Sequence, residues 1–296
     1  MCIRKVGKFK SHLGPLLKFL LRSHGYMLPG RAEVKGRDGK SGVWGTCSPD
    51  CARWPTGRAV FFAGALNGEP FRLDPYHSKF WRKATAGGWE PETFAVLDQH
   101  LSPDRDYVDI GAWIGPTVLY AARRARHVWC FEPDPVALRH LLWNLELNDI
   151  RNVSAFGVAL SDGFGLARMA SFGGEAGDSM TSLLASGAHG TEALTIGWDQ
   201  FAQTVDLSGV SLVKMDVEGA EFGVVPTLAN WLRAHRPAFY LSTHAPFLEE
   251  TKRAPAMAEL ARDLAFYSDA TDETGARADL TAAEAQTRFR SFLFSG

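Results

Sequence analysis

The chain has 296 residues, of which 46% are hydrophobic, so it can bury a full core in one large domain and still carry an appendage. Lys and Arg number 32 against 33 Asp and Glu, a net charge of −1. No overall positive field therefore indicates nucleic acid as the main partner. The composition is that of an ordinary soluble globular protein.

Residues 1–22 differ from the rest because six Lys and Arg side chains lie among leucines and phenylalanines. Lys18 interrupts the apolar run from Leu16 to Leu21, which is far shorter than the roughly 20 residues of a membrane span. We expect neither a transmembrane helix nor a signal peptide, which needs a longer apolar centre and a cleavage site. A solvated or docked helix is the simplest interpretation, and weak contact with a membrane surface or a partner is the alternative.

Four cysteines occur in the chain: Cys2, Cys47, Cys51 and Cys130. Cys47 and Cys51 form a C-x3-C pair, but no second pair follows, so the spacing of a structural zinc site is absent. We interpret all four as reduced thiols of a cytoplasmic protein.

The first regular pattern follows a segment rich in Gly, Pro, Ser and Arg, residues 30–68. Residues 89–101, WEPETFAVLDQHL, have apolar side chains spaced by three to four, which predicts a helix with a proline in its first turn. We place a lead-in region at residues 1–80 and the main domain at residues 81–296.

Strands and helices then alternate, which predicts a parallel sheet covered by helices on both faces. The last two strands have no helical spacing between them, so we expect the final strand to run antiparallel at or within the edge of the sheet. The predicted strands are Tyr107 to Ile110, Val128 to Phe131, Val153 to Leu160, Leu212 to Val217, Ala238 to Ser242, Leu264 to Ser268 and Phe289 to Phe294; the predicted helices are Pro116 to Arg126, Pro135 to Asn148, Glu221 to His235 and Glu249 to Leu264.

The alternation lapses in residues 161–211, a polar excursion rich in glycine. We expect a hairpin around GDSMTSLL and a helical segment in TIGWDQFAQ. An excursion of this length inside a compact domain is usually functional, so we interpret it as an insertion at the substrate site.

The stretch YVDIGAWIGPTVLY, residues 107–120, places two glycines where a strand gives way to a helix. In an open parallel sheet ligands bind at the carboxyl ends of the strands. Gly111 and Gly115 lack side chains, so a ligand can approach the backbone, and the N–H groups of the next helix favour an anionic group. The spacing G-x-x-x-G is not the dinucleotide fingerprint, because Ala112 and Trp113 fill the loop and no third glycine follows.

Glu132 ends the next strand, in VWCFEP, 23 residues after Asp109. An acid at this position accepts hydrogen bonds from both hydroxyls of an adenosine ribose. A ribose without a pyrophosphate, together with a carboxylate near the start of a helix, describes S-adenosylmethionine (SAM). A solvated acid at the end of a strand is the alternative for Glu132 taken alone.

Several segments resemble the class I methyltransferases of the FkbM type: VDIGAWIGPTVLYAA, VWCFEPDP, LRHLLWNLELNDIRNVS, VALSD and, above all, LVKMDVEGAE. The similarity covers residues 81–247. It implies a Rossmann-like fold with a seven-stranded, mostly parallel sheet and an antiparallel last strand. It also implies a SAM-dependent methyltransferase that acts on a hydroxyl oxygen of a sugar, polysaccharide, lipid or secondary metabolite.

The resemblance also assigns residues to the cofactor. Asp109, Gly111, Ala112 and Gly115 would surround its methionine moiety, and Glu132 would bind the ribose. Ser161 and Asp162 would lie near the adenine, and Asp162 could accept a hydrogen bond from its exocyclic amine. Asp216, at the end of its strand, would face the junction of cofactor and substrate.

Methyl transfer to a hydroxyl requires alignment of the acceptor and a base, or a metal that lowers the pKa of the hydroxyl. Asp216 and Glu218 extend from a strand end, whereas Glu221 is more simply a residue of the first helical turn. His244, after the next strand, is a second candidate base, although many relatives have an acid there. If Asp216, Glu218 and His244 converge, a divalent metal is chemically reasonable, but their spacing does not require one.

Two rival functions remain at this stage. An oxidoreductase with a nicotinamide cofactor would have to hold a pyrophosphate, which the missing third glycine disfavours. A binding module that keeps the cofactor fold without turnover would use the basic N-terminal segment for partner contact. The acceptor pocket of the enzyme would be formed by the lead-in and the excursion, where no recognisable motif occurs.

Overall fold

The computed structural model describes residues 61–171, 181–182 and 190–296. The basic segment of residues 1–22 lies outside the described residues, as do Cys2, Cys47 and Cys51 and most of the expected GDSMTSLL hairpin. The described residues belong to one compact unit, Val60–Gly296.

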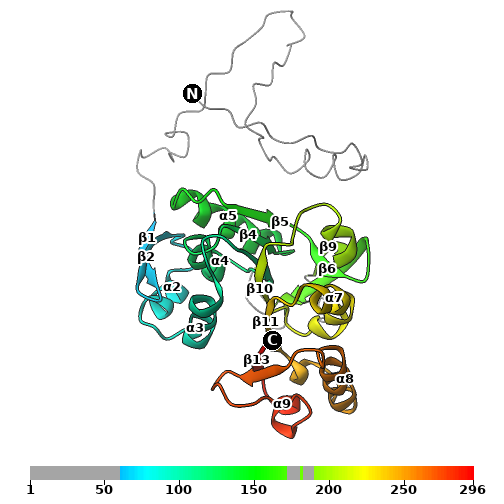
Figure 1. Cartoon of the computed structure of the whole chain (residues 1–296). Coiled ribbons are helices and arrows are strands. Elements are labelled where there is room, and N and C mark those ends of the chain that lie inside the picture. Colours follow the sequence, from blue (N-terminus) through cyan, green and yellow to red (C-terminus); the bar gives the residue numbers. More distant parts are fainter. Residues whose placement is uncertain (1–60, 172–180, 183–189) are drawn as a thin grey trace, which may run out of the picture. The chain divides into compact units, whose positions relative to one another are not determined.

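A seven-stranded sheet forms the centre of this unit, in the order β12-β13-β11-β10-β3-β4-β5 (Figure 1). The five strands from β11 to β5 are parallel, and β13 runs antiparallel to both of its neighbours. The expected antiparallel last strand is therefore confirmed, one position inside the edge. The strands are β3 (Asp106–Ile110), β4 (His127–Phe131), β5 (Val153–Phe156), β10 (Val210–Met215), β11 (Ala238–Thr243), β12 (Asp269–Asp272) and β13 (Arg290–Ser295).

Helices cover both faces of the sheet, and successive strand residues alternate between two apolar cores. Tyr107 packs with α2 to α5, whereas Val108 and Ile110 pack with α6 to α9. Figure 1 shows α3 and α4 on one side of β10 and β11 and α7 on the other. The helices are α2 (Ser78–Thr85), α3 (Pro91–His100), α4 (Pro116–Ala122), α5 (Pro135–Leu147), α6 (Trp198–Ala202), α7 (Glu221–His235), α8 (Glu250–Asp263) and α9 (Ala283–Thr287), with a 3-10 turn, η2, at Ala245–Phe247.

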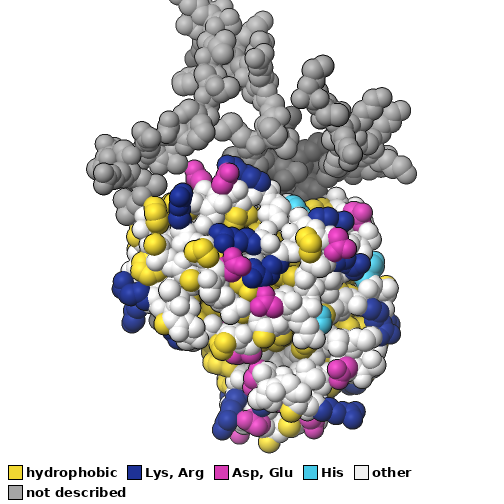
Figure 2. Space-filling model, turned by 60° about the vertical axis from the view of Figure 1, so that its left-hand side comes forward, with side chains coloured by type: hydrophobic (Ala, Val, Ile, Leu, Met, Phe, Trp, Pro, Cys, Tyr) yellow, Lys and Arg dark blue, Asp and Glu magenta, His cyan; other side chains and the backbone are white. Residues whose placement is uncertain are grey.

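The hairpin of β1 (Phe62–Leu66) and β2 (Glu69–Leu73) belongs to the same core as the sheet, together with α2. Leu66, Leu73 and Trp81 are fully buried in the cluster that contains Tyr107. The boundary expected at residue 80 therefore falls inside this compact unit, because apolar side chains on both of its sides share one core. Figure 2 shows basic and acidic side chains side by side on the surface.

The excursion contains a second sheet, in the order β6-β9-β7-β8. The single strand expected over Val153 to Leu160 is wrong: it breaks at Gly157 into β5 of the main sheet and β6 of the second sheet. TIG, expected to be helical, ends a strand, and the helix begins at Trp198. The strands are β6 (Ala159–Ser161), β7 (Gly165–Ser171), β8 (Thr181–Ser182) and β9 (Thr191–Gly197).

The penultimate strand of the main sheet differs from the prediction. Leu264 to Ser268 forms a turn after α8, and the strand is the polar segment β12 that follows. Leu264 and Tyr267 are apolar because they fill the core beneath the turn, where the Tyr267 hydroxyl donates to the Pro237 carbonyl at 2.7 Å. A short helix, α9, also separates the last two strands.

None of the helices in the described part of the chain is both long and apolar enough to cross a membrane.

Candidate cofactor pocket and charged cluster

A pocket of about 330 Å³ opens at the carboxyl ends of β3, β4 and β10, where an open parallel sheet binds its ligands. Its size lies at the lower end of the range for small-molecule sites, about 300–1,000 Å³. Of the residues predicted from sequence, it brings together Gly111, Ala112, Glu132, Asp216 and Glu218. The other lining residues are Phe80, Lys83, Trp89, Glu90, Ile110, Trp113, Pro116, Thr117, Phe131, Pro133, Val158, Ala159, Leu160, Met169, Ser182, Lys214, Val217, Ala220 and Val224.

The two loop glycines are required by the packing of the chain itself. Both have positive φ, +89° at Gly111 and +92° at Gly115, which L side chains rarely adopt. A Cβ at Gly111 would meet the backbone carbonyl oxygen of Asp216, and one at Gly115 would lie 2.3 Å from Leu141 Cδ1. The sequence argument that both glycines clear space for a ligand is therefore incomplete: Gly111 lines the pocket but also lets β3 and β10 approach, and Gly115 lets α4 pack on α5.

Glu132 holds the loop that follows β3. Its Oε2 accepts from the backbone N–H of Trp113 at 2.7 Å, and its Oε1 accepts from that of Asp134 at 2.8 Å. Trp113 has a left-handed φ of 48°, which the hydrogen bond to Glu132 helps to maintain. Burial raises the pKa of Glu132 to about 7, although the two N–H donors oppose this. Each carboxylate oxygen keeps a second lone pair that a hydroxyl of a ligand can use.

Asp109 lies beneath the pocket rather than in its lining, and its side chain is fully buried. Its Oδ2 accepts from the hydroxyls of Tyr107 at 3.0 Å and Thr117 at 2.5 Å, and its Oδ1 lies 3.6 Å from Lys214 Nζ. Burial raises the pKa of Asp109, and Lys214 opposes this shift. The contact with the cofactor that the resemblance implied would therefore be indirect, through Thr117, which does line the pocket.

Ser161 and Asp162 also lie outside the pocket lining, and Asp162 is exposed. The Ser161 hydroxyl donates to Asp162 Oδ1 at 3.1 Å. The preceding residues Val158 to Leu160 line the pocket instead, together with Met169 of β7. The VALSD segment thus reaches the pocket through its apolar part, and the excursion contributes to the wall.

Asp216, Glu218 and His244 converge at the edge of the pocket, although 28 positions separate the first from the last. His244 Nε2 lies 3.5 Å from Asp216 Oδ1 and 3.4 Å from Glu218 Oε2. His244 does not line the pocket itself, whereas the two acids do. We call these three residues the charged cluster; its two oxygens and one nitrogen form a donor set that a divalent cation can use.

Glu221 fixes the backbone on both sides of this cluster. It is fully buried, its Oε1 accepts from the backbone N–H of His244 at 2.6 Å, and its Oε2 accepts from that of Gly219 at 2.8 Å. His244 Nδ1 lies 3.4 Å from the same Oε1. Glu221 therefore joins the loops after β10 and β11, a structural role in keeping with the sequence interpretation.

The titration of the charged cluster follows from its mutual contacts. Burial lowers the pKa of His244, but the neighbouring carboxylates of Glu221, Asp216 and Glu218 outweigh it and raise that pKa to about 9. Burial raises the pKa of Glu218 to about 7, with His244 opposing. Burial also acts to raise the pKa of Asp216, but Lys214 and His244 reverse this and lower it. At neutral pH the imidazole is therefore protonated, and Glu218 titrates.

Sequence reasoning missed three charged residues of the pocket lining, Lys83, Glu90 and Lys214. Lys214 is buried, with its Nζ 3.4 Å from Asp216 Oδ2 and 3.6 Å from Asp109 Oδ1. Glu90 precedes α3 in a left-handed conformation, and its Oε2 accepts from the Thr93 hydroxyl at 3.0 Å. Burial, reinforced by Asp216, raises the pKa of Glu90 to about 7.

Three aromatic rings form one part of the pocket wall. Phe80 of α2 lies edge-on to Trp113, with ring centroids 4.6 Å apart, and to Trp89 at 5.2 Å. All three rings line the pocket. Trp113 belongs to the glycine loop noted in the sequence, whereas Phe80 and Trp89 lie near the border of the expected domain and carried no signal of their own.

The order of the sheet, its inserted antiparallel strand and the pocket at the strand ends together define a class I methyltransferase fold. The methyltransferase FkbM domain matches residues 109–270, more than half of the chain, and the protein belongs to this family. The family depends on SAM. No curated protein matches the chain by sequence.

Three solved structures illustrate the range of similar proteins. A methyltransferase FkbM from Methylobacillus flagellatus is 17% identical with a TM-score of 0.41, over 65% of this chain and 44% of that one. A Streptococcus mutans protein in complex with SAH is 11% identical with a TM-score of 0.43, over 69% of this chain and 96% of that one. An rRNA methylase from Streptococcus thermophilus is 9% identical with a TM-score of 0.41, over 68% of this chain and 92% of that one. The chain thus spans less than half of the Methylobacillus protein, and these similarities carry no information on the acceptor.

Proposed function

We propose that the protein is a SAM-dependent O-methyltransferase whose acceptor is a hydroxyl of a sugar, polysaccharide, lipid or secondary metabolite. The observation that carries the proposal is the charged cluster of Asp216, Glu218 and His244 at the edge of the cofactor-sized pocket. A hydroxyl is a weak nucleophile at neutral pH, so its methylation requires a group that takes up its proton. Nucleophiles that are already neutral amines need less assistance of this kind.

The pocket offers a complementary group for each part of the cofactor. Glu132 would accept from the ribose hydroxyls, and the apolar segment Val158 to Leu160 would face the adenine. Gly111 and Ala112 would lie along the methionine moiety. Glu90 and Lys83, two further lining residues of opposite charge, would face its ammonium and carboxylate groups.

SAM supplies an electrophilic methyl group on a positively charged sulfur. Glu218 is the best base for the acceptor, because its pKa of about 7 matches neutral pH and it lines the pocket. His244, protonated at this pH, would hold Glu218 and Asp216 in place and stabilise their negative charge. From sequence we expected Asp216 or His244 to be the base. In this proposal Glu218 takes that role, and Asp216 and His244 orient it.

The same donor set supports a second version of the mechanism. Asp216, Glu218 and His244 offer one ligand atom each, and these atoms lie within 4.8 Å of one another. A divalent metal held there would take the place of the His244 proton and lower the pKa of a bound hydroxyl. Addition of a chelator separates the versions, because transfer that proceeds unchanged without metal requires a side chain of the protein as the base.

The location proposed is the cytoplasm, as expected from the four thiols. Among the described residues, Cys130 supports it, because its side chain is a free thiol buried in β4.

The proposal is tested by incubating the full-length protein with methyl-labelled SAM and fractionated cell extract. We expect label in a carbohydrate, lipid or small-molecule fraction, in a bond that resists mild base as a methyl ether does. Label in protein or RNA would refute the hydroxyl acceptor. Calorimetry with SAM and with a nicotinamide dinucleotide tests the two rivals: only the dinucleotide should bind to an oxidoreductase, and SAM binding without transfer to any fraction would indicate a binding module.

A further inference from the structure

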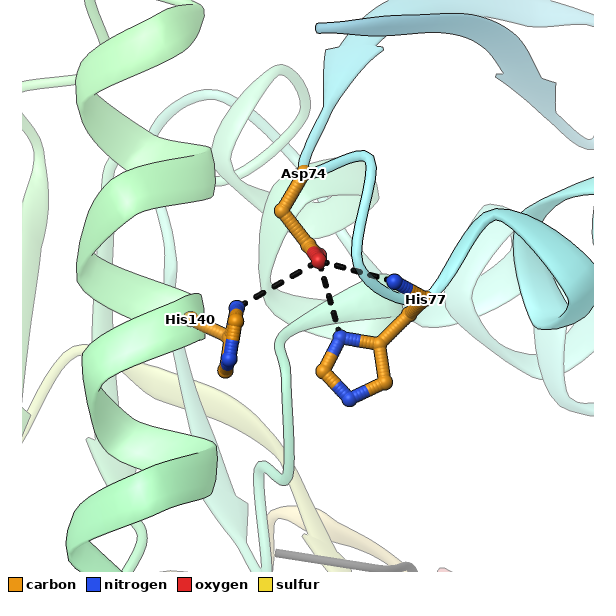
Figure 3. Close-up of side chains that lie close together, drawn as sticks. All are labelled: Asp74, His77 and His140. Carbon is orange, nitrogen blue, oxygen red and sulfur yellow. Dashed lines mark hydrogen bonds and ion pairs between the residues drawn. The ribbon is translucent and has the colours of Figure 1, made fainter. Parts of the chain in front are cut away.

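A second group of potential metal ligands lies outside the pocket, on elements that the lead-in and α5 contribute (Figure 3). Asp74 follows β2, His77 precedes α2, and His140 lies within α5. Asp74 is fully buried, and the side chains of His140 and His77 are 3% and 15% exposed. No part of the proposed methyl transfer uses these residues.

Too many donors point at one oxygen of Asp74. Its Oδ1 lies 3.0 Å from the backbone nitrogen of His77, 2.9 Å from His77 Nδ1 and 3.3 Å from His140 Nδ1. A carboxylate oxygen has two lone pairs: the backbone N–H of His77 occupies one, and the His77 ring occupies the other when its Nδ1 carries the proton. His140 Nδ1 is buried and points at the same oxygen, but it makes no hydrogen bond.

The other oxygen of Asp74 is held in place independently. Its Oδ2 accepts from Trp81 Nε1 at 3.0 Å and from Asn144 Nδ2 at 3.2 Å, while Asn144 Oδ1 accepts from the Asp74 backbone N–H at 2.7 Å. One oxygen of Asp74 is thus fixed by two hydrogen bonds, and the other faces two imidazoles. Carboxylates that bind metal ions are oriented by outer-shell hydrogen bonds of this kind.

We propose that Asp74 Oδ1, His77 Nδ1 and His140 Nδ1 bind a divalent transition metal ion, zinc in the first place. Two histidines and a carboxylate form a known donor set for zinc, with a fourth position for water. Ligand atoms at the corners of a tetrahedron with bonds of about 2.0–2.1 Å are about 3.3 Å apart. The Asp74 to His140 separation equals this edge, and the Asp74 to His77 separation is somewhat shorter.

An ion at this position would join the turn between β2 and α2 to helix α5. The His77 ring also lies edge-on to Trp113, with centroids 5.9 Å apart, and Trp113 belongs to the pocket wall. The metal would therefore fix one wall of the pocket without touching the reacting groups, which is a structural rather than a catalytic role. Tyr76, 75% exposed and stacked on His140, covers the outer side of the site.

The test uses tag-free, full-length protein with the charged cluster disabled by Asp216→Asn and Glu218→Gln, so that this second potential site does not contribute. After removal of metals with a chelator, Zn²⁺ is added, excess ion is dialysed away and bound zinc is measured by elemental analysis. We expect His140→Ala and Asp74→Asn each to lose about one equivalent of zinc relative to this background. His235→Ala, an exposed histidine of α7, is the matched control and should lose none. Binding outside the described residues is common to all variants and cancels.

Two further measurements keep the proposal testable if the substitutions impair folding. X-ray absorption of the zinc-loaded background protein should show two imidazoles and an oxygen ligand. In His140→Cys, Co²⁺ should give a thiolate-to-cobalt charge-transfer band that the background protein lacks. Equal zinc content in the background, His140→Ala and Asp74→Asn, or a zinc absorption spectrum without imidazole, would overturn the proposal. Neither result would bear on the proposed methyl transfer, because Asp74, His77 and His140 take no part in it.

Discussion

The two sides of the pocket are built on different physical principles. On the cofactor side, the loop of Gly111 and Trp113 is fixed by close backbone packing and by two hydrogen bonds to Glu132. On the other side, the charged cluster is held by ion pairs of 3.4–3.5 Å among its own members. The first arrangement preserves a shape, whereas the second displaces pKa values in both directions. In the proposed function, cofactor binding and proton transfer would thus fall to separate walls, which variants can test one at a time.

The largest effect is expected for Glu218→Gln, because the amide cannot accept the acceptor's proton. The transfer rate to the labelled fraction should fall by about 10²–10⁴-fold, while SAM affinity, measured by calorimetry, stays close to that of the unmodified protein. Glu250→Gln, an exposed acid at the start of α8, is the control and should leave the rate unchanged. A rate that survives Glu218→Gln would return the role of base to Asp216 or to a bound metal.

Gly111→Ala should destabilise the fold itself. The added methyl group would collide with the carbonyl oxygen of Asp216, on a residue whose φ is +89°. We expect a loss of about 2–5 kcal/mol in the free energy of unfolding, or insoluble protein, from the combination of overpacking and backbone strain. Urea denaturation measures this loss.

The matched control is Gly223→Ala in α7, where an added Cβ meets open space. Helix propensity predicts that it is neutral or stabilises the protein by up to about 1 kcal/mol. Equal stability of the two alanine variants would contradict the close contact between β3 and β10.

Glu132→Gln should weaken cofactor binding, because Glu132 belongs to the side of the pocket proposed to hold the cofactor. The amide keeps one acceptor but turns an NH2 group toward an N–H donor, and it loses the charge that strengthens hydrogen bonds to ribose hydroxyls. We expect the Kd for SAM to rise by about 10- to 100-fold, in line with hydrogen bonds to charged groups. Asp162→Asn is the comparison variant. Because Asp162 lies outside the pocket lining, the Kd of this variant for SAM should change by less than about twofold. A large effect at Asp162 would restore the adenine contact expected from sequence.

The smallest effect is a pH-dependent gain of stability in Glu90→Gln. Burial and the Asp216 charge raise the pKa of Glu90 from 4.5 to about 7, so the native state holds the proton more tightly than the unfolded chain does. Its contribution to stability is complete below pH 4.5 and is lost as the pH rises through 7. The full shift corresponds to about 3 kcal/mol, which the partial exposure of Glu90 reduces. The variant should therefore nearly equal the unmodified protein at pH 4.5 and be about 1–2 kcal/mol more stable at pH 8.

Urea unfolding at both pH values measures this difference. Glu92→Gln, on the first turn of the same helix, should instead cost up to about 1 kcal/mol through the helix dipole. A gain at pH 8 that is no larger than the gain at pH 4.5 would show that Glu90 carries no charge penalty in the native protein.

The central sheet and the position of the pocket follow from local patterns in the sequence. β3, β4 and β10 are rich in apolar residues, and each is followed by a glycine or an acid, so Glu132 and Asp216 could be identified from those ends. Asp134 caps the start of helix α5, and its side chain accepts from the N–H groups of Val136 and Ala137, as the order acid-proline-helix indicates. These signals are local, so one sequence suffices to detect them.

What the sequence did not predict depends on contacts between distant segments. Glu90 acquires its role only because α3 brings it beside Asp216, and a single acid before a proline carries no such information. β12 is polar because it lies at the sheet edge, whereas the apolar run before it fills the core from a turn. The roles of Gly111 and Gly115 could likewise not be separated from ligand binding before the neighbouring chain segments were placed.

Lys214 has a consequence for how such a sequence can diverge. One buried ammonium neutralises two carboxylates at once, Asp109 beneath the cofactor loop and Asp216 in the charged cluster. A neutral side chain at this position would leave the fully buried Asp109 without a cation and Asp216 with His244 alone, and no single compensating substitution repairs both. Descendants of this protein should therefore inherit the three residues as a block, or exchange all of them together.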